Sequence, residues 1–483
     1  MKKVFSALSV ICLSLYVSAA SRPNILLITT DDQGLQVGCY GDELARTPNL
    51  DRLAEQGVRF TQAYIAQASC SSSRSAILTG LYPHQNGQFG LTNDYEMHPG
   101  IETLPAMLKK EGYHTGIIGK LHVRPESAFP FDFWEIKSAK DTRHVRNVNR
   151  STQHFLDSVG SKPFFLMVNL FDPHRPYDAE SNQCDGLPEK PLGPDDIKPF
   201  EFMGVDTPEL RAEVAAYYNC VARLDTGIGL LMETLEQRGL SDNTLVVFLG
   251  DHGVPFTRAK VSCYEAGEQV PFIVRWPKGR SGSVCDRLIS SVDIVPTIAE
   301  LVDFKPRTEL SGQSLVPLLE GKEPPWRQFV CAEYTAHRKE HFYPRRSIRN
   351  TRYKLVHNLL HERINPLTGI GPVRAVSETG AVKNGSSWNV LNPEFYQSGR
   401  FYGGSSEQIR AAYAAYRDAP EYELYDLEKD PFERVNLVGN PEVAQVFETL
   451  KTNLENWQAE TDDSFADSKY LATFTAKTDA LCK

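Results

Sequence analysis

Residues 24–30 (NILLITT), followed directly by Asp31 and Asp32, decide how this chain folds. A short apolar run rich in β-branched side chains predicts a buried strand, and the two carboxylates then stand at its carboxyl end. Runs of the same kind recur later, with helical patterns between them, at residues 115–119 (TGIIG), 164–170 (FFLMVNL) and 244–249 (TLVVFL). Buried strands that alternate with helices predict an α/β domain with a large, mostly parallel sheet flanked by helices.

Two of the helical patterns carry clear end signals. One begins at Thr47 and Pro48 and stops at Gly57, which matches an N-cap, a proline in the first helical position and a terminating glycine. The longest pattern begins with the same pair of residue types, Thr207 and Pro208, and closes near Gly239.

The pattern of expected strands and helices changes after about Trp326. Four separated strands are expected there, with few helices between them, at residues 329–334, 346–349, 353–356 and 422–426. A helix is expected to close this region around residues 441–459. We therefore predict one large α/β domain over residues 21–325 and a small C-terminal α+β subdomain, with an antiparallel sheet, over residues 326–483.

Bulk properties exclude several classes of partner. The 483 residues carry a formal net charge of -9 and no basic run, which argues against nucleic acid. Lys2 and Lys3 precede an apolar run that ends in small residues at 18–20, which is typical of a cleavable signal peptide over residues 1–20. We therefore expect a secreted or periplasmic protein without stable membrane insertion, since the run is short for a membrane span.

Polar residues gather where the predicted strands end. Each of the four strands is followed by a close pair of such residues, namely Asp31 and Asp32, Lys120 and His122, Asp172 and His174, and Asp251 and His252. In an open α/β sheet the ligand crevice lies at the carboxyl ends of the strands. Aspartate after a strand is also common in ordinary turns, so the argument rests on all four pairs together.

The segment at residues 70–80 (CSSSRSAILTG) is the sharpest local signal. Serines before an apolar run predict a helix N-terminus, whose free N–H groups attract anions. Arg74 lies one helical turn after Cys70 and would face the same way. The alternative is a buried structural cysteine beside a surface arginine.

This segment resembles the signature of the sulfatase family, Cys-x-Pro-Ser-Arg-x-x-x-Leu-Thr-Gly, in which the cysteine is oxidised to formylglycine. Ser72 stands where the family usually has proline. The strand-end residues also follow the order that sulfatases show. The resemblance implies an alkaline-phosphatase-like sulfatase fold, a formylglycine at position 70 and a formylglycine-generating maturation enzyme as a partner.

Other stretches resemble the heparan N-sulfatase (sulfamidase) branch of that family, among them residues 82–90 (YPHQNGQFG), 172–175 (DPHR) and 343–347 (YPRRS). This resemblance implies a sulfated glycan substrate, namely N-sulfoglucosamine at the non-reducing end of heparan sulfate or heparin fragments. Alternatives are an O-sulfatase acting on a glycosaminoglycan or another sulfated sugar, a phosphatase or phosphodiesterase of the same superfamily, and a non-catalytic glycan-binding protein. The oligomeric state stays open, with a homodimer as one option.

The resemblance also implies roles for individual residues. One divalent cation, expected to be Ca²⁺, would be held by Asp31, Asp32, the modified Cys70, Asp251 and His252. His252 departs from the asparagine that is usual there, and imidazole suits Ca²⁺ less well than an amide oxygen. The expected catalytic residues are Cys70, Arg74, Lys120, His122, His174 and Lys260. Further substrate contacts are expected from Arg258, His337 and Arg346.

Overall fold

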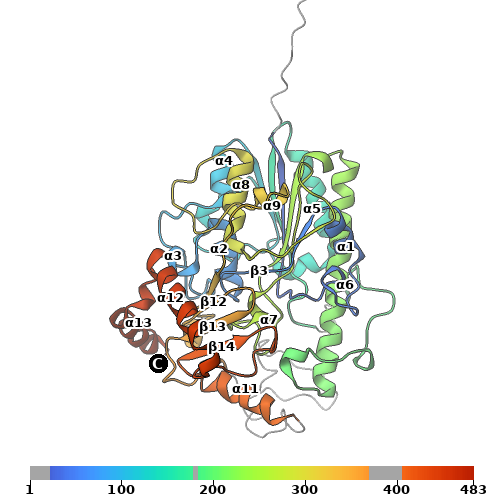
Figure 1. The fold of residues 1–483 in the computed structure, drawn as a ribbon. Coiled ribbons are helices and arrows are strands. Elements are labelled where there is room, and N and C mark those ends of the chain that lie inside the picture. The colour runs from blue at the N-terminus through green and yellow to red at the C-terminus, as the bar shows by residue number, and fades with distance from the viewer. Residues whose placement is uncertain (1–21, 178–182, 369–404, 483) are drawn as a thin grey trace, which may run out of the picture.

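The structure is a computed structural model that describes residues 22–177, 183–368 and 405–482 (Figure 1). The predicted signal peptide at residues 1–20 lies outside the described residues. Among the helices that are described, none combines the length and the apolar character that a bilayer crossing requires.

The larger sheet has eight strands in the order β5-β4-β6-β1-β7-β8-β2-β9. These are β5 (Phe133–Glu135), β4 (His114–Ile118), β6 (Phe164–Leu170), β1 (Asn24–Thr30), β7 (Thr244–Gly250), β8 (Phe272–Arg275), β2 (Val58–Phe60) and β9 (Ser283–Cys285). The strands from β5 to β7 are parallel, and β8 runs antiparallel to both of its neighbours. The predicted large, mostly parallel sheet is confirmed.

Helices cover both faces of this sheet (Figure 1). One face carries α1 (Pro48–Glu55), α5 (Val145–Ser158) and α6 (Pro208–Gln237). The other face carries α2 (Cys70–Thr79), α4 (Leu104–Lys110), α8 (Ile294–Val302) and α9 (Val316–Leu319). Side chains alternate along β1, so that Leu26 and Ile28 pack into the first layer while Ile25 and Leu27 pack into the second. Burial on both faces explains why residues 25–28 are apolar without alternation.

The end signals of the two predicted helices hold. Thr207 caps α6 by accepting a hydrogen bond from the backbone N–H of Leu210, and Pro208 occupies the first helical position. Thr47 and Pro48 stand in the same positions at the start of α1. Two shorter helices, α3 (Pro83–Asn86) and α7 (Glu265–Glu268), and a two-stranded pair, β3 (Ala63–Tyr64) with β10 (Ile289–Ser290), lie around the sheet's carboxyl edge.

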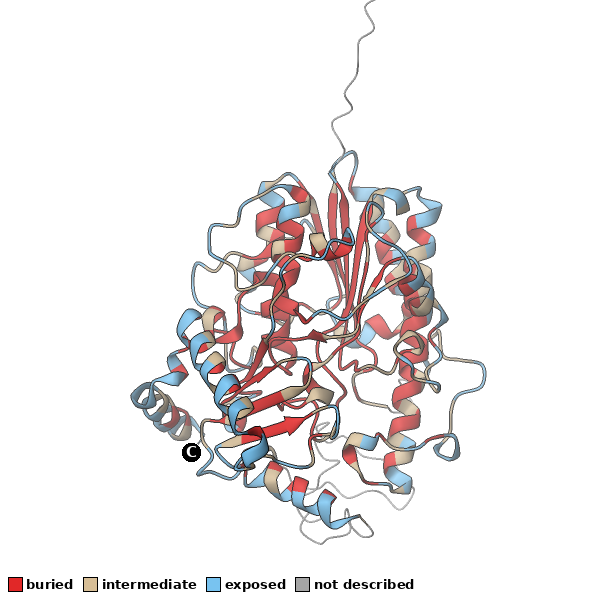
Figure 2. Cartoon of the chain, viewed as in Figure 1, coloured by how far each residue is buried: buried red, intermediate tan, exposed pale blue. Residues whose placement is uncertain are grey.

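The C-terminal region forms a four-stranded antiparallel sheet, as predicted, in the order β11-β12-β13-β14. Its strands are β11 (Val330–Tyr334), β12 (Arg345–Arg349), β13 (Tyr353–Asn358) and β14 (Tyr422–Asp426). Among the described residues this region also contains the helices α11 (Glu407–Arg417), α12 (Ala444–Glu460) and α13 (Ser468–Leu481), and α12 packs on this sheet. Figure 2 shows most strands of both sheets buried, while the edge strands β5 and β9 are partly exposed and the outer helices expose one side. The division of the chain after residue 325 stays a prediction.

Candidate active site

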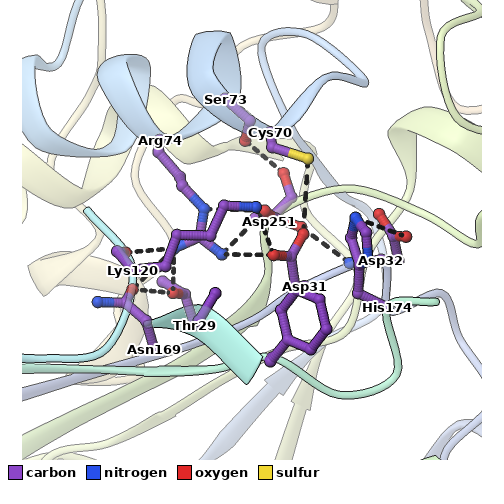
Figure 3. Close-up of polar contacts among 12 residues, drawn as sticks. Thr29, Asp31, Asp32, Cys70, Ser73, Arg74, Lys120, Asn169, His174 and Asp251 are labelled. Atoms are coloured by element: carbon purple, nitrogen blue, oxygen red, sulfur yellow. Dashed lines mark hydrogen bonds and ion pairs between the residues drawn. The ribbon is translucent and has the colours of Figure 1, made fainter. Parts of the chain in front are cut away.

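The order of the larger sheet gathers the four polar segments at one edge. β4, β6, β1 and β7 are direct neighbours, and all four are parallel, so their carboxyl ends meet. The side chains that follow them converge with the start of α2 (Figure 3).

Cys70 is the first residue of α2, and the extended residue Ser69 precedes it. The thiol is buried, with Sγ 3.5 Å from Asp31 Oδ1 and 3.3 Å from His252 Nε2. One turn on, Arg74 donates from Nε to Asp251 Oδ2 at 3.0 Å and places Nη2 3.8 Å from Asp31 Oδ2. The helix therefore presents both residues to the strand-end carboxylates, as the spacing predicts.

Thr29 and Asn169 support the guanidinium of Arg74, although neither belongs to a recognisable sequence motif. Thr29 on β1 and Asn169 on β6 are directly paired in register, and Thr29 Oγ1 donates to Asn169 Oδ1 at 2.5 Å. Arg74 Nη1 donates to Asn169 Oδ1 at 2.8 Å and to Thr29 Oγ1 at 3.2 Å (Figure 3). The only sequence signal is a polar side chain inside an apolar strand.

Four buried residues form a group that could hold a metal ion, namely Asp31, Asp32, Cys70 and His252, whose candidate ligand atoms all lie within 4.8 Å of one another. His252 donates from Nδ1 to the Gly253 carbonyl at 2.9 Å, which leaves Nε2 facing Asp32 Oδ1 at 3.2 Å. Asp32 Oδ2 is buried and accepts no hydrogen bond within the described residues. Two carboxylates and an imidazole nitrogen that faces them fit a divalent cation.

Asp251, the remaining predicted ligand, lies beside this group. Its Oδ1 accepts a hydrogen bond from the backbone N–H of Asp32 at 3.0 Å and lies 3.7 Å from His252 Nε2. Burial and the neighbouring Asp31 raise the pKa of the Asp251 carboxyl. Burial alone would lower the pKa of His252, but Asp251 raises it to about 9. The carboxylates therefore attract positive charge to the place where a cation would sit.

Two lysines and a histidine face the same carboxylates. Lys120 Nζ lies 2.6 Å from Asp31 Oδ2, and Lys260 Nζ lies 2.6 Å from Asp32 Oδ1. Burial would raise the pKa of Asp31, but Lys120 leads the positive groups that hold it well below the usual range. His174 Nε2 lies 3.8 Å from Asp32 Oδ2, and burial lowers the pKa of His174 to about 4. The two lysines therefore bring positive charge to the carboxylates, where it could help to bind an anion.

Strained backbone marks the same region. Asp32 and His122 have positive φ angles of 70 and 55, and Arg258 and Val261, which flank the Lys260 segment, have φ of 63 and 61. Non-glycine residues in this conformation are uncommon and tend to cluster at functional sites; four others in the described chain, Ile136, Asp303, Glu433 and Asp462, lie outside this site. Burial lowers the pKa of His122 well below its usual range, with Lys120 adding to the effect, so its imidazole is neutral.

The three residues expected to contact substrate from the C-terminal side differ in their placement. His337 reaches the site, because its Nδ1 lies 3.0 Å from the hydroxyl of Ser69, next to Cys70. Arg258 donates instead to the carbonyls of Ala412, Phe432 and Glu433. Arg346 forms a buried, two-pronged ion pair with Asp463, at 2.6 and 2.9 Å. Both arginines thus have structural partners, and neither enters the function that we propose.

Comparison with known proteins identifies the class. The family model described as "Sulfatase" matches residues 23–304, and the one described as "N-sulphoglucosamine sulphohydrolase, C-terminal" matches residues 250–367. The chain therefore belongs to the sulfatase family. It is an enzyme that hydrolyses sulfate esters or sulfamates.

Individual relatives agree with this assignment. Human N-sulphoglucosamine sulphohydrolase is 33% identical, over 92% of this chain and 91% of the human protein. An N-acetylglucosamine-6-O-sulfatase of Bacteroides thetaiotaomicron is 26% identical, over 94% of this chain and 89% of the relative. A solved structure in complex with its substrate D-glucosamine-2-N,6-O-disulfate has a TM-score of 0.67 at 22% identity and covers 92% of this chain and 99% of its own. The predicted sulfatase fold is confirmed.

Proposed function

We propose that this sulfatase removes the N-sulfate from N-sulfoglucosamine at the non-reducing end of heparan sulfate or heparin fragments. The observation that carries the proposal is the C-terminal match at residues 250–367, a region that includes Lys260 and His337. This match supports a relationship on the substrate side of the site, which the general sulfatase signature does not address. Identity of 33% to the human N-sulphoglucosamine sulphohydrolase supports the same substrate class.

In this proposal Asp31, Asp32, Asp251 and His252, together with the modified side chain at position 70, hold one Ca²⁺ ion. The oxygen of the modified side chain would stand where Cys70 Sγ lies, close to both Asp31 and His252. A bound Ca²⁺ would supply charge stabilisation for the sulfate oxygens. Hard carboxylate ligands favour Ca²⁺ over softer metals.

The nucleophile in this proposal is the hydrated aldehyde of formylglycine at position 70. It supplies two hydroxyls on one carbon, one to attack sulfur and one whose deprotonation expels sulfate afterwards. Asp251 is the proposed base for the attacking hydroxyl, because burial raises the pKa of its carboxyl above the ordinary value and so favours proton uptake. His122 is neutral and partly buried, its Nδ1 is buried without a hydrogen-bond partner in the described chain, and it is proposed to hydrogen-bond the hydrate.

Positive side chains would bind the sulfate group and a histidine would release the sugar. Arg74, Lys120 and Lys260 are proposed to hold sulfate oxygens, because all three are charged and pair with the strand-end carboxylates. His174 is proposed to protonate the leaving nitrogen. It is neutral in the free site, and the negative charge of the arriving sulfate favours its protonated form.

A second candidate is O-sulfatase activity on a sulfated sugar, which the 26% identity to an N-acetylglucosamine-6-O-sulfatase favours. The two candidates predict different products. We expect purified protein to release sulfate from N-sulfoglucosamine at least about 10-fold faster, in kcat/KM, than from 6-O- or 2-O-sulfated glucosamine. A preference for either O-sulfate would overturn the N-sulfate assignment and leave the sulfatase family assignment intact.

Conversion of Cys70 is tested separately. Mass spectrometry of the peptide that contains Cys70 is expected to show formylglycine in active protein. Cys70→Ala should abolish turnover, while Cys331→Ala, which changes a buried cysteine in the small sheet, should not. Sulfate release by Cys70→Ala would contradict the proposed nucleophile.

Three further proposals follow from the sequence. Residues 1–20 direct the chain to the periplasm or outside the cell. A maturation enzyme that tolerates Ser72 generates the formylglycine. Elemental analysis of the active protein should find one calcium per chain, and the absence of any divalent metal would contradict the proposed ligand set.

A further inference from the structure

Asp172 follows β6 at the sheet edge, but it is not part of the group that could hold a metal. Its carboxylate accepts hydrogen bonds from Arg223, from Nε to Oδ2 at 2.6 Å and from Nη2 to Oδ1 at 3.0 Å. It also accepts one from Arg143, from Nε to Oδ1 at 2.9 Å. All three side chains are buried. Two buried guanidinium groups on one carboxylate are costly to desolvate, so stability alone does not explain this arrangement.

Arg143 differs from Arg223 in what else it touches. Its Nη2 donates a short hydrogen bond to the backbone carbonyl of His174. Its guanidinium also lies over the ring of Phe171, 4.7 Å from the centroid. Phe171 in turn stacks on the imidazole of His174, with ring centroids 4.6 Å apart and planes 30° apart. Arg143 therefore supports the backbone of His174 directly and its ring through Phe171.

A further contact fixes the orientation of that imidazole. His174 Nδ1 lies 2.5 Å from the carbonyl oxygen of Arg175 and donates to it, which leaves Nε2 toward the carboxylate group of Asp32 (Figure 3). Nε2, which would carry a proton to the substrate, therefore points in a defined direction. Three contacts of His174 set that direction: one at its backbone carbonyl, one on the face of its ring and one at Nδ1.

We propose that Arg143 is a positioning residue that aims His174 Nε2 at the leaving group, while Arg223 anchors Asp172 and does not position the imidazole. The inference rests on the proposed role of His174 as proton donor. A donor must lie within hydrogen-bond reach of the atom it protonates, and small misplacements cost a large part of its contribution. Arg143 comes from a short 3-10 helix, Ala139–Arg143, before α5, and no motif in the sequence marks it.

The test compares two substrates that differ in their need for a proton. N-Sulfoglucosamine has a poor leaving group that must be protonated, whereas 4-nitrophenyl sulfate releases a stable phenolate that needs no proton donor. Lysine at position 143 keeps the charge but cannot make all three contacts of the arginine. Arg143→Lys should lower kcat on N-sulfoglucosamine by about 10- to 100-fold and change kcat on 4-nitrophenyl sulfate less than about 3-fold.

Arg223→Lys is the matched control, since it changes the other guanidinium on the same carboxylate. Among the described residues, neither a hydrogen bond nor a ring contact joins Arg223 to His174 or Phe171. Arg223→Lys should therefore change kcat on both substrates by the same factor. An equal loss on both substrates with Arg143→Lys, or no loss on either, would overturn the proposal.

Two further variants separate the possible failures. If His174→Ala lowers kcat equally on both substrates, the proposed donor role of His174 is wrong. If His174→Ala lowers kcat selectively on N-sulfoglucosamine but Arg143→Lys does not, only the positioning inference fails. If Arg143→Lys does not fold, Phe171→Leu tests the same idea, because it removes the stacked ring and leaves both arginines on Asp172. If the wild type prefers an O-sulfated sugar, that sugar replaces N-sulfoglucosamine in the comparison.

Discussion

At the scale of single residues, Thr29 and Thr30 are neighbours on β1 with opposite hydrogen-bonding states. Thr29 Oγ1 bonds both Asn169 and Arg74, whereas Thr30 Oγ1 is buried without a partner in the described chain. Valine has the shape of threonine without the hydroxyl. We expect Thr29→Val to lower the free energy of unfolding by about 1–3 kcal/mol and Thr30→Val to leave it within about 0.5 kcal/mol or raise it. Urea denaturation of both variants checks this, and equal losses would contradict it.

The same residues mark the limit of prediction from sequence at this scale. The sequence predicts that Cys70 and Arg74 face one site, because both lie on one helix and a single period relates them. It does not predict the support for Arg74, because Thr29 and Asn169 stand 45 and 95 positions away in sequence from it. Arg143 is missed for the same reason: its partner Asp172 lies 29 positions away on another element.

At the scale of elements, the ion pair between Arg346 and Asp463 joins β12 to the turn between α12 and α13. Both side chains are buried, and Gln458 of α12 also donates to Asp463 Oδ2 at 3.0 Å. Asp463→Asn removes the negative charge and leaves Arg346 with less compensation, so unfolding should become easier by about 3–5 kcal/mol. Asp462→Asn, at the exposed neighbouring position, should change stability by less than about 0.5 kcal/mol.

The same ion pair predicts a dependence on pH. Burial alone would raise the pKa of Asp463, but Arg346 outweighs it and holds the pKa well below the usual value. A carboxyl whose folded pKa is depressed stabilises the fold above its unfolded pKa of about 4, and this contribution disappears as the pH falls below that value. Between pH 7 and pH 3 the wild type should therefore lose more stability than Asp463→Asn. Parallel stability curves for the two proteins would contradict this.

Elements were predictable where a local period or an end signal marks them. The Thr-Pro signals locate the starts of α1 and α6, and the apolar runs locate β1, β4, β6 and β7. The prediction of a strand from residue 346 is one residue late, since β12 begins at Arg345, which pairs with Tyr334 of β11. The residues of β8 do not predict that this strand is antiparallel. Its direction depends on the long connection from β7 and on the pairing with β2.

At the scale of the whole molecule, buried charges join the two sheets. Lys354 of β13 is fully buried and lies 3.1 Å from Glu265 and 2.8 Å from Glu268, both on α7 beside the larger sheet. Arg258 extends from the segment of Lys260 to three backbone carbonyls of the C-terminal region. We therefore propose that residues 21–325 and 326–483 are two structural regions that unfold as one cooperative unit.

Calorimetry of the full chain tests this last prediction. We expect a single transition, whose calorimetric and van't Hoff enthalpies agree, and loss of sulfatase activity at the same temperature. Lys354→Met leaves Glu265 and Glu268 together without their shared cation, which should lower the midpoint of that single transition by about 5 °C. Lys469→Met, an exposed position on α13, should leave the midpoint unchanged. Two transitions, of which Lys354→Met shifts only one, would show that the small sheet unfolds independently and that the buried charges do not couple it to the site.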